Sequence, residues 1–367
     1  MVLSSLRLKD FRNYISAELS FCDRINFFHG LNGQGKTSVL EAIYYLSLSK
    51  SFRTQDDLTV IRFDAPYLEV EGLFEKDQRS LVNQVRVVVH RTDGKSVLVD
   101  KRRLDRLADL VGQFPSVVAA PEDVLIISGA PSGRRRWLDI AISQVQSVYL
   151  KDLQIYRQAL RQRNALLLES AVQPDSLDVW DRELSQTGAR LIRARKFYLE
   201  RLSPYVEDVY RSISDGNETI GLGYRSSIEW EAEDLLENTF LTQLRTARSR
   251  DILRRSSTVG PHKDEVVFEL GGHPFREYAS QGQFKTLAVA IRFAEFLCMS
   301  DHHDRIPLLL LDDVFSELDA NRRYHLMAYL DRAHQVFITG TEPWEKALSK
   351  QEIRLFEVED AHVEAVH

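Results

Sequence analysis

Short alternating and apolar runs dominate the first hundred positions, and one longer run has helical spacing. Leu3–Leu8 alternates and Ile25–His29 is a short apolar run, so both predict strands. Over Lys36–Leu48 apolar residues recur at three- and four-residue steps, which predicts a helix. Three further strands are expected, the last two joined as a hairpin by the turn at 92–95: Tyr67–Phe74, Leu81–His90 and Ser96–Asp100.

The pattern becomes mainly helical between about Pro131 and Arg255. Tyr149–Leu167 has an amphipathic helical repeat, and a second helix is expected over Leu177–Tyr210 with a break at Ser203-Pro204. Beyond this region strands and helices alternate again. The expected strands are Val266–Leu270, Ile306–Leu311 and Gln335–Thr339, and the expected helices are Gln283–Met299 and a segment from Asp319 to about Leu330.

This order predicts an α/β fold in which both ends of the chain build one domain. We expect that domain to comprise residues 1–105 and 256–367, and a mainly helical second domain to be inserted at 106–255. A length of 367 residues suggests two or three structural units and is sufficient for a sizeable core.

Composition excludes several classes of protein. Two cysteines, Cys22 and Cys298, cannot form a disulfide framework or a four-ligand zinc site, and they favour a reducing, cytoplasmic setting. No apolar run reaches the ~20 residues that span a bilayer, and the first residues lack the apolar core of a signal peptide. The net charge of −6 does not exclude nucleic acid as a partner, because binding depends on local patches.

Residues 30–37 match the phosphate-binding pattern G-x-x-x-x-G-K-[ST] between an expected strand and an expected helix. In such a loop backbone N–H groups surround the phosphates, Lys36 reaches them and the Thr37 hydroxyl is a ligand of Mg²⁺. The nucleotide-binding residues are therefore Gly30, Leu31, Asn32, Gly33, Gln34, Gly35, Lys36 and Thr37.

Two carboxylates follow the apolar run Leu308–Leu311. Asp312, at the end of a buried strand, is placed to hold Mg²⁺ together with Thr37, and Asp313 is placed to polarise the attacking water. Lys36, Asp312 and Asp313 are the expected catalytic residues. By itself the pair could also cap a core strand, but beside a phosphate loop the metal-binding interpretation is favoured.

Ser280-Gln281-Gly282-Gln283 resembles the signature motif of ATP-binding-cassette ATPases, and Ser316–Asp319 resembles their D-loop. The resemblance implies that Ser280, Gly282 and Gln283 of one subunit complete the ATP site of another. Considered alone, the first motif could also be an ordinary helix N-cap.

Further motifs resemble those of the RecF family, which is related to the chromosome-structuring ATPases. They are the segment 121–139, with Trp137 where Phe or Tyr is usual, the segment 311–326, Ser51–Thr54, Thr258–Asp264 and Leu8–Tyr14. The insertion is too short for a long coiled coil, which also favours this family. The resemblance spans residues 3 to 341 and adds Arg12 to the nucleotide-binding set.

The resemblance implies a weak ATPase that uses ATP and Mg²⁺ as a switch in recombinational DNA repair and replication restart. ATP would close a homodimer on duplex or gapped DNA, slow hydrolysis would release it, and mediator proteins would be partners.

Two departures from the wider superfamily support slow hydrolysis. Glu122 or Asp123 stands where a Q-loop glutamine is usual, and Thr339 stands where a histidine switch is expected.

Basic clusters in the insertion are candidate DNA contacts without base readout. They comprise Arg134, Arg135, Arg136, Lys151, Arg157, Arg161 and Arg163, then Arg190, Arg193, Arg195, Lys196 and Arg201, and finally Arg245, Arg248, Arg250, Arg254 and Arg255. The alternative to DNA contact is a solvated helix face whose cations are paired with Glu169, Glu183 or Glu200.

Two other functions stay open for the protein as a whole: a cassette ATPase energising a membrane or multiprotein complex, and a small-molecule kinase.

Overall fold

The computed structural model describes residues 1–76, 81–169, 173–214, 218–302, 305–316, 319–341 and 352–366. It divides into two compact units. Unit 1 comprises Met1–Asp123, Asp208–Gly216 and Lys285–His367, and unit 2 comprises Val124–Glu207 and Asn217–Phe284. The expected α/β fold with both chain ends in one unit and a mainly helical insertion is therefore observed.

Unit 1 contains two sheets of six strands. One is antiparallel, in the order β2 (Tyr14–Ser20), β1 (Val2–Phe11), β4 (Tyr67–Lys76), β5 (Leu81–His90), β6 (Gly94–Val99), β7 (Arg102–Arg103). The other has the order β15 (His362–Val366), β14 (Ile353–Glu359), β3 (Ile25–His29), β13 (Val336–Gly340), β12 (Leu308–Asp312), β8 (Ser116–Ala119), and all its pairs except β14–β15 are parallel.

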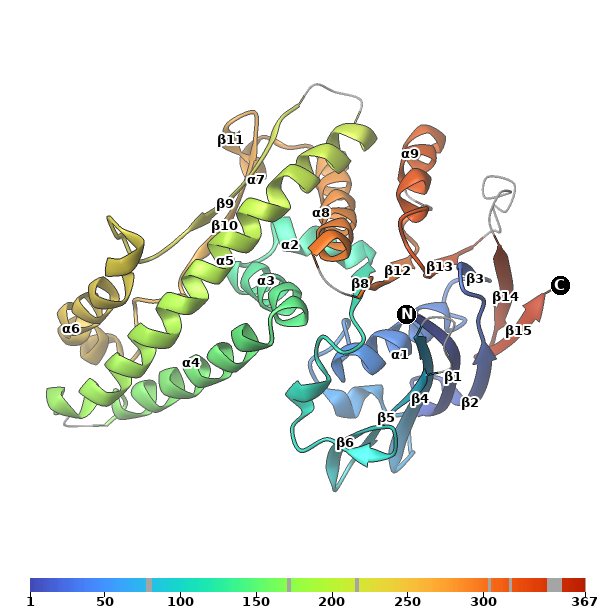
Figure 1. Cartoon of the computed structure of the whole chain (residues 1–367), viewed down its shortest axis with the longest axis horizontal. Helices are drawn as coiled ribbons and strands as arrows, with labels where there is room; N and C mark the ends of the chain where they lie inside the picture. The colour runs from blue at the N-terminus through green and yellow to red at the C-terminus, as the bar shows by residue number, and fades with distance from the viewer. Residues whose placement is uncertain are drawn as a thin grey trace. The chain divides into compact units, whose positions relative to one another are not determined.

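Helix α1 (Lys36–Leu48) contacts strands of both sheets (Figure 1). It is buried almost all round, so polar side chains such as Glu41 lie inside the unit and require partners there. Unit 1 also contains α9 (Ala320–Leu330), and α8 (Gln281–His302) contributes residues to both units.

Aromatic packing ties the two chain ends together in the parallel sheet. The rings of Phe28 and Phe356 stack with centroids 4.8 Å apart, and Phe21 meets Phe337 edge to face at 4.9 Å. These contacts each join residues more than three hundred positions apart. They place the phosphate loop, which follows β3, in the centre of the sheet.

Unit 2 combines helices with a small antiparallel sheet of β11 (His273–Pro274), β10 (Glu265–Leu270) and β9 (Ile220–Arg225). Its helices are α2 (Val124–Ser128), α3 (Pro131–Val145), α4 (Ser147–Leu166), most of α5 (Asp178–Ile213), α6 (Leu236–Arg254) and α7 (Phe275–Tyr278). Short 3₁₀ turns lie in both units: at Asp57–Val60, Leu107–Leu110 and Pro121–Asp123 in unit 1, and at Pro174–Leu177 and Glu233–Leu235 in unit 2.

The expected domain boundaries at 105/106 and 255/256 differ from this division. Strand β8 pairs in parallel with β12, so the segment up to Asp123 belongs to the sheet of unit 1. Strand β10 pairs with β9 of the insertion, so the chain returns to unit 1 only at Lys285. Both differences arise from strand partners that lie far away in the sequence.

The break expected at Ser203-Pro204 is absent, because α5 continues through Pro204. Leu202 and Val206, on either side of the proline, are both fully buried. Their packing holds the helical course although the proline removes one backbone donor. In the part of the chain that the structure describes, no helix is long and apolar enough to cross a membrane.

Candidate nucleotide-binding site

The loop Gly30–Thr37 connects β3 to the start of α1 and has the backbone that its glycines permit. Gly35 has φ 114°, and a Cβ there would lie 2.9 Å from Asn13 Nδ2 and Tyr14 Oη. Gly30 has φ 149°, and a Cβ there would lie 2.3 Å from the Val358 carbonyl oxygen. Only glycine suits both places, so the tight curl of the loop is fixed by these residues.

Lys36 directs its ammonium group back into this loop. Its Nζ donates to the carbonyl oxygens of Gly30 at 2.6 Å and Leu31 at 2.8 Å. Burial lowers the pKa of Lys36, and the charges of Asp313 and Asp312 oppose that effect. The ammonium group of Lys36 therefore lies at the loop and is subject to the charges of both carboxylates.

Asp312 ends β12 with a buried carboxylate that accepts two hydroxyl protons. Thr37 Oγ1 donates to its Oδ1 at 2.9 Å, and Thr339 Oγ1 donates to the same atom at 2.7 Å. Burial raises the pKa of Asp312, and the Thr339 and Thr37 hydrogen bonds lower it. The structure thus brings together Thr37 and Asp312, the two expected metal ligands.

These two side chains supply hydroxyl and carboxylate oxygens, the donor types that Mg²⁺ prefers. No group of three or more His, Cys, Asp or Glu residues in the described ranges is arranged to hold a metal ion. A site of few protein ligands fits Mg²⁺ that is shared with nucleotide phosphates.

Asp313 has a strained backbone and an unpaired carboxylate oxygen. Its φ of 53° lies in the left-handed region, and its N–H donates to Thr339 Oγ1 at 2.9 Å. Its Oδ1 is buried and has no hydrogen-bond partner among the described residues. A buried unpaired acceptor beside a phosphate loop is suited to orienting a water molecule.

Arg12 is held by a buried carboxylate that sequence reasoning missed. Its Nε and Nη2 donate to Glu41 at 2.8 Å and 2.5 Å, and its Nη1 donates to the Thr59 carbonyl oxygen at 3.0 Å. Ser51 Oγ also donates to Glu41, and Arg53 Nη1 lies 3.7 Å from it. Glu41 lies one helical turn beyond Thr37 on α1. An acidic residue so close to the phosphate loop was the one signal in the sequence that pointed to this partner of Arg12.

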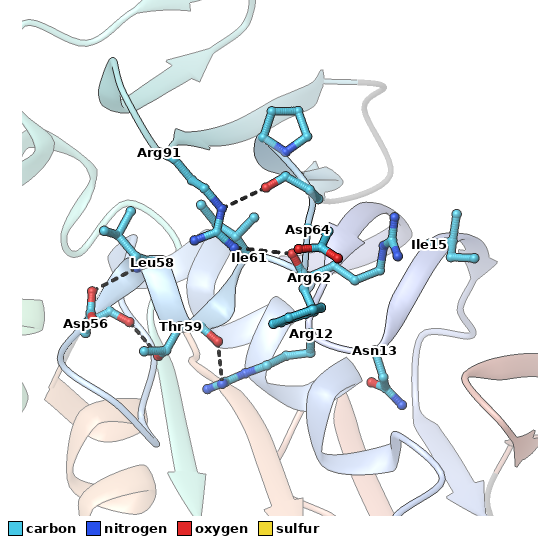
Figure 2. A pocket seen from close by; sticks show the side chains of 13 residues that line it. Arg12, Asn13, Ile15, Asp56, Leu58, Thr59, Ile61, Arg62, Asp64 and Arg91 are labelled. Atoms are coloured by element: carbon cyan, nitrogen blue, oxygen red, sulfur yellow. Dashed lines mark hydrogen bonds between the residues drawn. The ribbon is translucent and has the colours of Figure 1, made fainter.

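Arg12 and Asn13 also line an open pocket of 1290 Å³ (Figure 2). Leu58 and Ile61 contribute apolar surface, and Arg62 adds a cation that is paired with Asp10. Since Asn13 borders Gly35, this pocket adjoins the phosphate loop. It offers an apolar surface next to a phosphate site.

The two candidates for the Q-loop position have different surroundings. Asp123 accepts from Arg292 Nη2 at 2.5 Å and from the Ala120 N–H at 2.8 Å, so both of its oxygens are engaged. Glu122 is exposed, and its charge contributes to raising the pKa of Asp312. Of the two, Glu122 acts electrostatically on the metal-side carboxylate.

The remaining loop residues differ in exposure. Leu31 is 74% exposed, and Asn32 is exposed as well. Gln34 is half-buried and contacts the turn between β14 and β15. Its Oε1 accepts from the Asp360 N–H at 2.6 Å, and its carbonyl accepts from the Ala361 N–H at 3.0 Å. This support could not be predicted from the sequence, because the turn lies over three hundred residues away from Gln34.

Ser280 and Gln283, which belong to unit 2, form a reciprocal cap at the start of α8. The Gln283 N–H donates to Ser280 Oγ at 3.3 Å, and the Ser280 N–H donates to Gln283 Oε1 at 2.6 Å. Gly282 is exposed beside them. The N-cap geometry weighed as the alternative is thus present, and it leaves the Ser280 side chain and Gly282 at the surface.

The D-loop segment is described at its two ends. Ser316 Oγ donates to the Asp313 carbonyl oxygen at 2.8 Å, and Asp319 caps α9 by accepting from the Arg322 N–H at 2.9 Å. Glu317 and Leu318 lie outside the described residues. Ser316 is therefore connected to the backbone of Asp313, the residue that carries the proposed catalytic carboxylate.

Many arginines of the insertion have aspartate or glutamate partners inside unit 2. The pairs are Arg134 with Glu265, Arg157 and Arg195 with Asp139, Arg190 with Asp152, Arg163 with Asp181 and Asp251, and Arg248 with Asp178 and Asp181. Arg163 is completely buried. None of these pairs uses the expected Glu169, Glu183 or Glu200, and in each pair the charge of the arginine is compensated within the insertion.

Known protein families and structures resemble this chain over almost its whole length. The model of the RecF/RecN/SMC N terminal domain matches residues 2–364. A DNA replication and repair protein RecF from Streptococcus gordonii is 34% identical over 364 residues, covering 99% of this chain and 100% of that protein. One from Salinibacter ruber is 38% identical over 363 residues, covering 96% of this chain and 88% of that protein.

A solved structure of the recombination mediator protein RecF with ATPrS, in the RecFOR pathway, superposes with a TM-score of 0.90. It is 32% identical and covers 100% of this chain and 98% of that one. An Smc head bound to the C-terminal winged-helix domain of ScpA gives a TM-score of 0.57 at 16% identity, which supports the shared fold. The chain therefore belongs to the RecF family, and its fold is that of an ATP-binding-cassette-type ATPase.

Proposed function

We propose that this protein is an ATP-switched DNA-binding protein of recombinational repair and replication restart, in which a slow ATPase sets the lifetime of the DNA-bound state. The contact between Thr37 and Asp312 at the mouth of the phosphate loop carries the nucleotide part of the proposal. The similarity to RecF proteins supports the DNA part.

In this proposal Lys36 and the backbone N–H groups of the loop bind the phosphates, and Thr37 and Asp312 hold Mg²⁺. Mg²⁺, when bound, neutralises charge that develops on the transferred phosphoryl oxygens. Arg12, fixed by Glu41, faces the pocket beside the loop, whose apolar surface from Leu58 and Ile61 suits the base of a nucleotide.

Hydrolysis requires an oriented water molecule. Asp313 offers a buried carboxylate oxygen without a partner in the described structure, and we assign it the role of accepting a hydrogen bond from that water. The products are ADP and inorganic phosphate. An aspartate is a weak base, and Thr339 has no titrating group, so we expect slow turnover.

Ser280, Gly282 and Gln283 are proposed to bind the phosphates of ATP held on the loop of a second copy of the chain. Their hydroxyl and backbone N–H groups at a helix start are suited to phosphate oxygens. ATP then stabilises the dimer because it contacts both chains, and the dimer retains duplex or gapped DNA with the mediator proteins of recombinase loading as partners.

Sedimentation of the protein with and without ATP and duplex DNA tests this function. The parent is expected to dimerise with ATP and to retain DNA, whereas Lys36→Met loses both because a cation is removed from the phosphate loop.

Asp312→Asn should weaken Mg²⁺-dependent ATP binding, and Asp313→Asn should bind ATP and trap the dimer. Equal hydrolysis rates in the parent and both aspartate variants would contradict the assignment.

A further inference from the structure

The antiparallel sheet of unit 1 carries arginines that are paired with acids on neighbouring strands. Arg7 of β1 lies 3.2 Å from Glu18 of β2 and 3.3 Å from Glu71 of β4. Arg86 of β5 lies 2.6 Å from Glu69 of β4. From β2 to β5, cations and carboxylates therefore offset one another across the strands.

This pairing ends at the last two strands. Arg103 of β7 is opposite Leu98, and Arg102 is opposite Val99, so neither faces an acid on β6. Lys101, Arg102, Arg103 and Arg106 are all exposed. Among the residues that the structure describes, no acidic side chain lies within ion-pair distance of any of these four, which we call the β6–β7 basic edge.

The turn between β6 and β7 fixes the direction of these cations. Asp100 and Lys101 have φ values of 50° and 65°, the left-handed pair of a tight two-residue hairpin. The Asp100 carboxylate accepts from Asn83 Nδ2 at 2.8 Å and from the Gln84 N–H at 2.9 Å. The one acid inside the turn is thus hydrogen-bonded to β5 and forms no ion pair with the neighbouring cations.

The backbone after the turn is also held in place. The Leu104 N–H donates to the Val97 carbonyl oxygen at 2.9 Å, so the segment that carries Arg102 and Arg103 is attached to the buried part of β6. Because its backbone is already ordered, this surface loses little backbone freedom when it binds a ligand.

We propose that the β6–β7 basic edge binds the phosphate backbone of duplex DNA without reading its bases. This inference rests on the proposed function and names the surface that it uses. Four exposed cations and one exposed carboxylate, Asp105, lie within residues 101–106, and their net charge of +3 matches a polyanion with closely spaced charges. Leu107 is the only large apolar side chain exposed within residues 100–110, whereas the core of a protein–protein interface is typically depleted of charge and enriched in aromatic residues.

The arginines of the insertion are less available for this purpose. Arg134, Arg163 and Arg195 are buried in ion pairs, and Arg157, Arg190 and Arg248 also contact aspartates. Freeing any of them for DNA would leave an aspartate without its partner. The basic edge requires no such exchange.

A cationic edge strand has a second use, since charge discourages pairing with another sheet edge. That use requires no contact with DNA, so a binding measurement separates the two. The variant Lys101→Gln/Arg102→Gln/Arg103→Gln removes three charges from the edge. The matched control Lys50→Gln/Arg182→Gln/Arg225→Gln removes three charges from exposed positions outside both the edge and the basic clusters of the insertion, none of which has an acidic partner within ion-pair distance in the described structure.

Duplex affinity is measured by fluorescence anisotropy with ATP and Mg²⁺ over a series of salt concentrations, and binding of a fluorescent ATP analogue reports the folded nucleotide site. The edge variant should bind duplex about tenfold or more weakly, with a salt slope reduced by roughly 2 to 3, and should bind nucleotide like the parent. The control should stay close to the parent.

Equal duplex affinity in the parent and the edge variant would overturn the proposal while leaving the proposed function intact. An equal loss of affinity in the control would overturn it as well, because the effect would then follow net charge. A parent that binds ATP and fails to bind duplex at any salt concentration would overturn the proposed function together with this surface.

Discussion

At the scale of single residues, Thr339 connects the two carboxylates of the proposed site. Its hydroxyl donates to Asp312 Oδ1 and accepts from the Asp313 N–H, so it is a donor to one aspartate and an acceptor for the backbone of the next. These two bonds orient Asp312 and stabilise the left-handed backbone of Asp313.

We therefore expect Thr339→Val to lower turnover about tenfold or more and to raise the Mg²⁺ concentration needed for ATP binding, because a methyl group replaces the hydroxyl at similar volume. Thr339→Ser keeps the hydroxyl and should restore most of both. Turnover and Mg²⁺-dependent binding of a fluorescent nucleotide are the two measurements. A Val variant that matches the Ser variant in both would show that the hydroxyl has no positioning role.

At the scale of elements, α4, α5 and α6 of unit 2 are joined by buried polar contacts rather than by apolar packing alone. Arg163 of α4 donates to Asp181 of α5 at 2.7 Å and to Asp251 of α6 at 2.8 Å, and all three side chains are fully buried. Removing any one of these charges would leave another buried charge without its partner, so we expect the network to favour this arrangement of the three helices.

His262 belongs to the same region and makes it sensitive to acid. Its Nδ1 lies 2.7 Å from Tyr156 Oη of α4, and its Nε2 lies 3.1 Å from the Ser257 carbonyl oxygen. A neutral ring satisfies both contacts by donating from Nε2 and accepting at Nδ1. Burial lowers the pKa of His262 to about 4 from its ordinary value of 6.5.

Between these two values the unfolded chain binds a proton that the folded chain does not, so stability is complete above pH 6.5 and falls as the pH drops toward 4. His262 alone should cost roughly 2 kcal/mol of unfolding free energy between pH 7.5 and pH 5. Urea unfolding at both pH values measures it.

His262→Gln should reduce the difference between the two pH values by about that amount, whatever it does to stability at pH 7.5. His273→Gln, at an exposed position of β11, is the control and should keep the parent's pH dependence. An unchanged difference in the His262 variant would show that acid acts on other groups.

At the scale of the whole molecule, the phosphate loop belongs to unit 1 and the signature residues Ser280 and Gly282 belong to unit 2. If ATP joins two chains, each complete site takes its loop from one chain and its signature from the other. Ser280→Arg should then leave ATP binding by a single chain almost intact and abolish the ATP-dependent dimer.

Mixing two inactive variants tests this arrangement directly. In a dimer of one Ser280→Arg chain and one Lys36→Met chain, pairing between chains leaves one site without a lesion and places both lesions in the other. An equal mixture should recover part of the parent's hydrolysis rate, up to about half, because only mixed dimers can close on ATP and each has one intact site of two. Pairing within one chain gives no recovery, and this outcome, with mixed dimers shown to form, would reject the arrangement.

The sequence alone determined the features that depend on residues close together in the chain. Gly30 and Gly35 require backbone angles that only glycine readily adopts, and Ser280 and Gln283 form a cap at a spacing of three. The apolar run before Asp312 predicted a buried strand with a carboxylate at its end, and the order of the motifs indicated the family. Local conformation and short spacing are written directly in the sequence.

The tertiary structure decided which distant residues became partners. Glu41 with Arg12, Thr339 with Asp312 and Arg163 with Asp251 join residues between 27 and 88 positions apart. No spacing rule predicts such pairs, because they arise when strands and helices pack. The same packing decided which arginines are paired inside the insertion and left Lys101, Arg102 and Arg103 exposed on an edge strand, where no neighbouring strand supplies an acid.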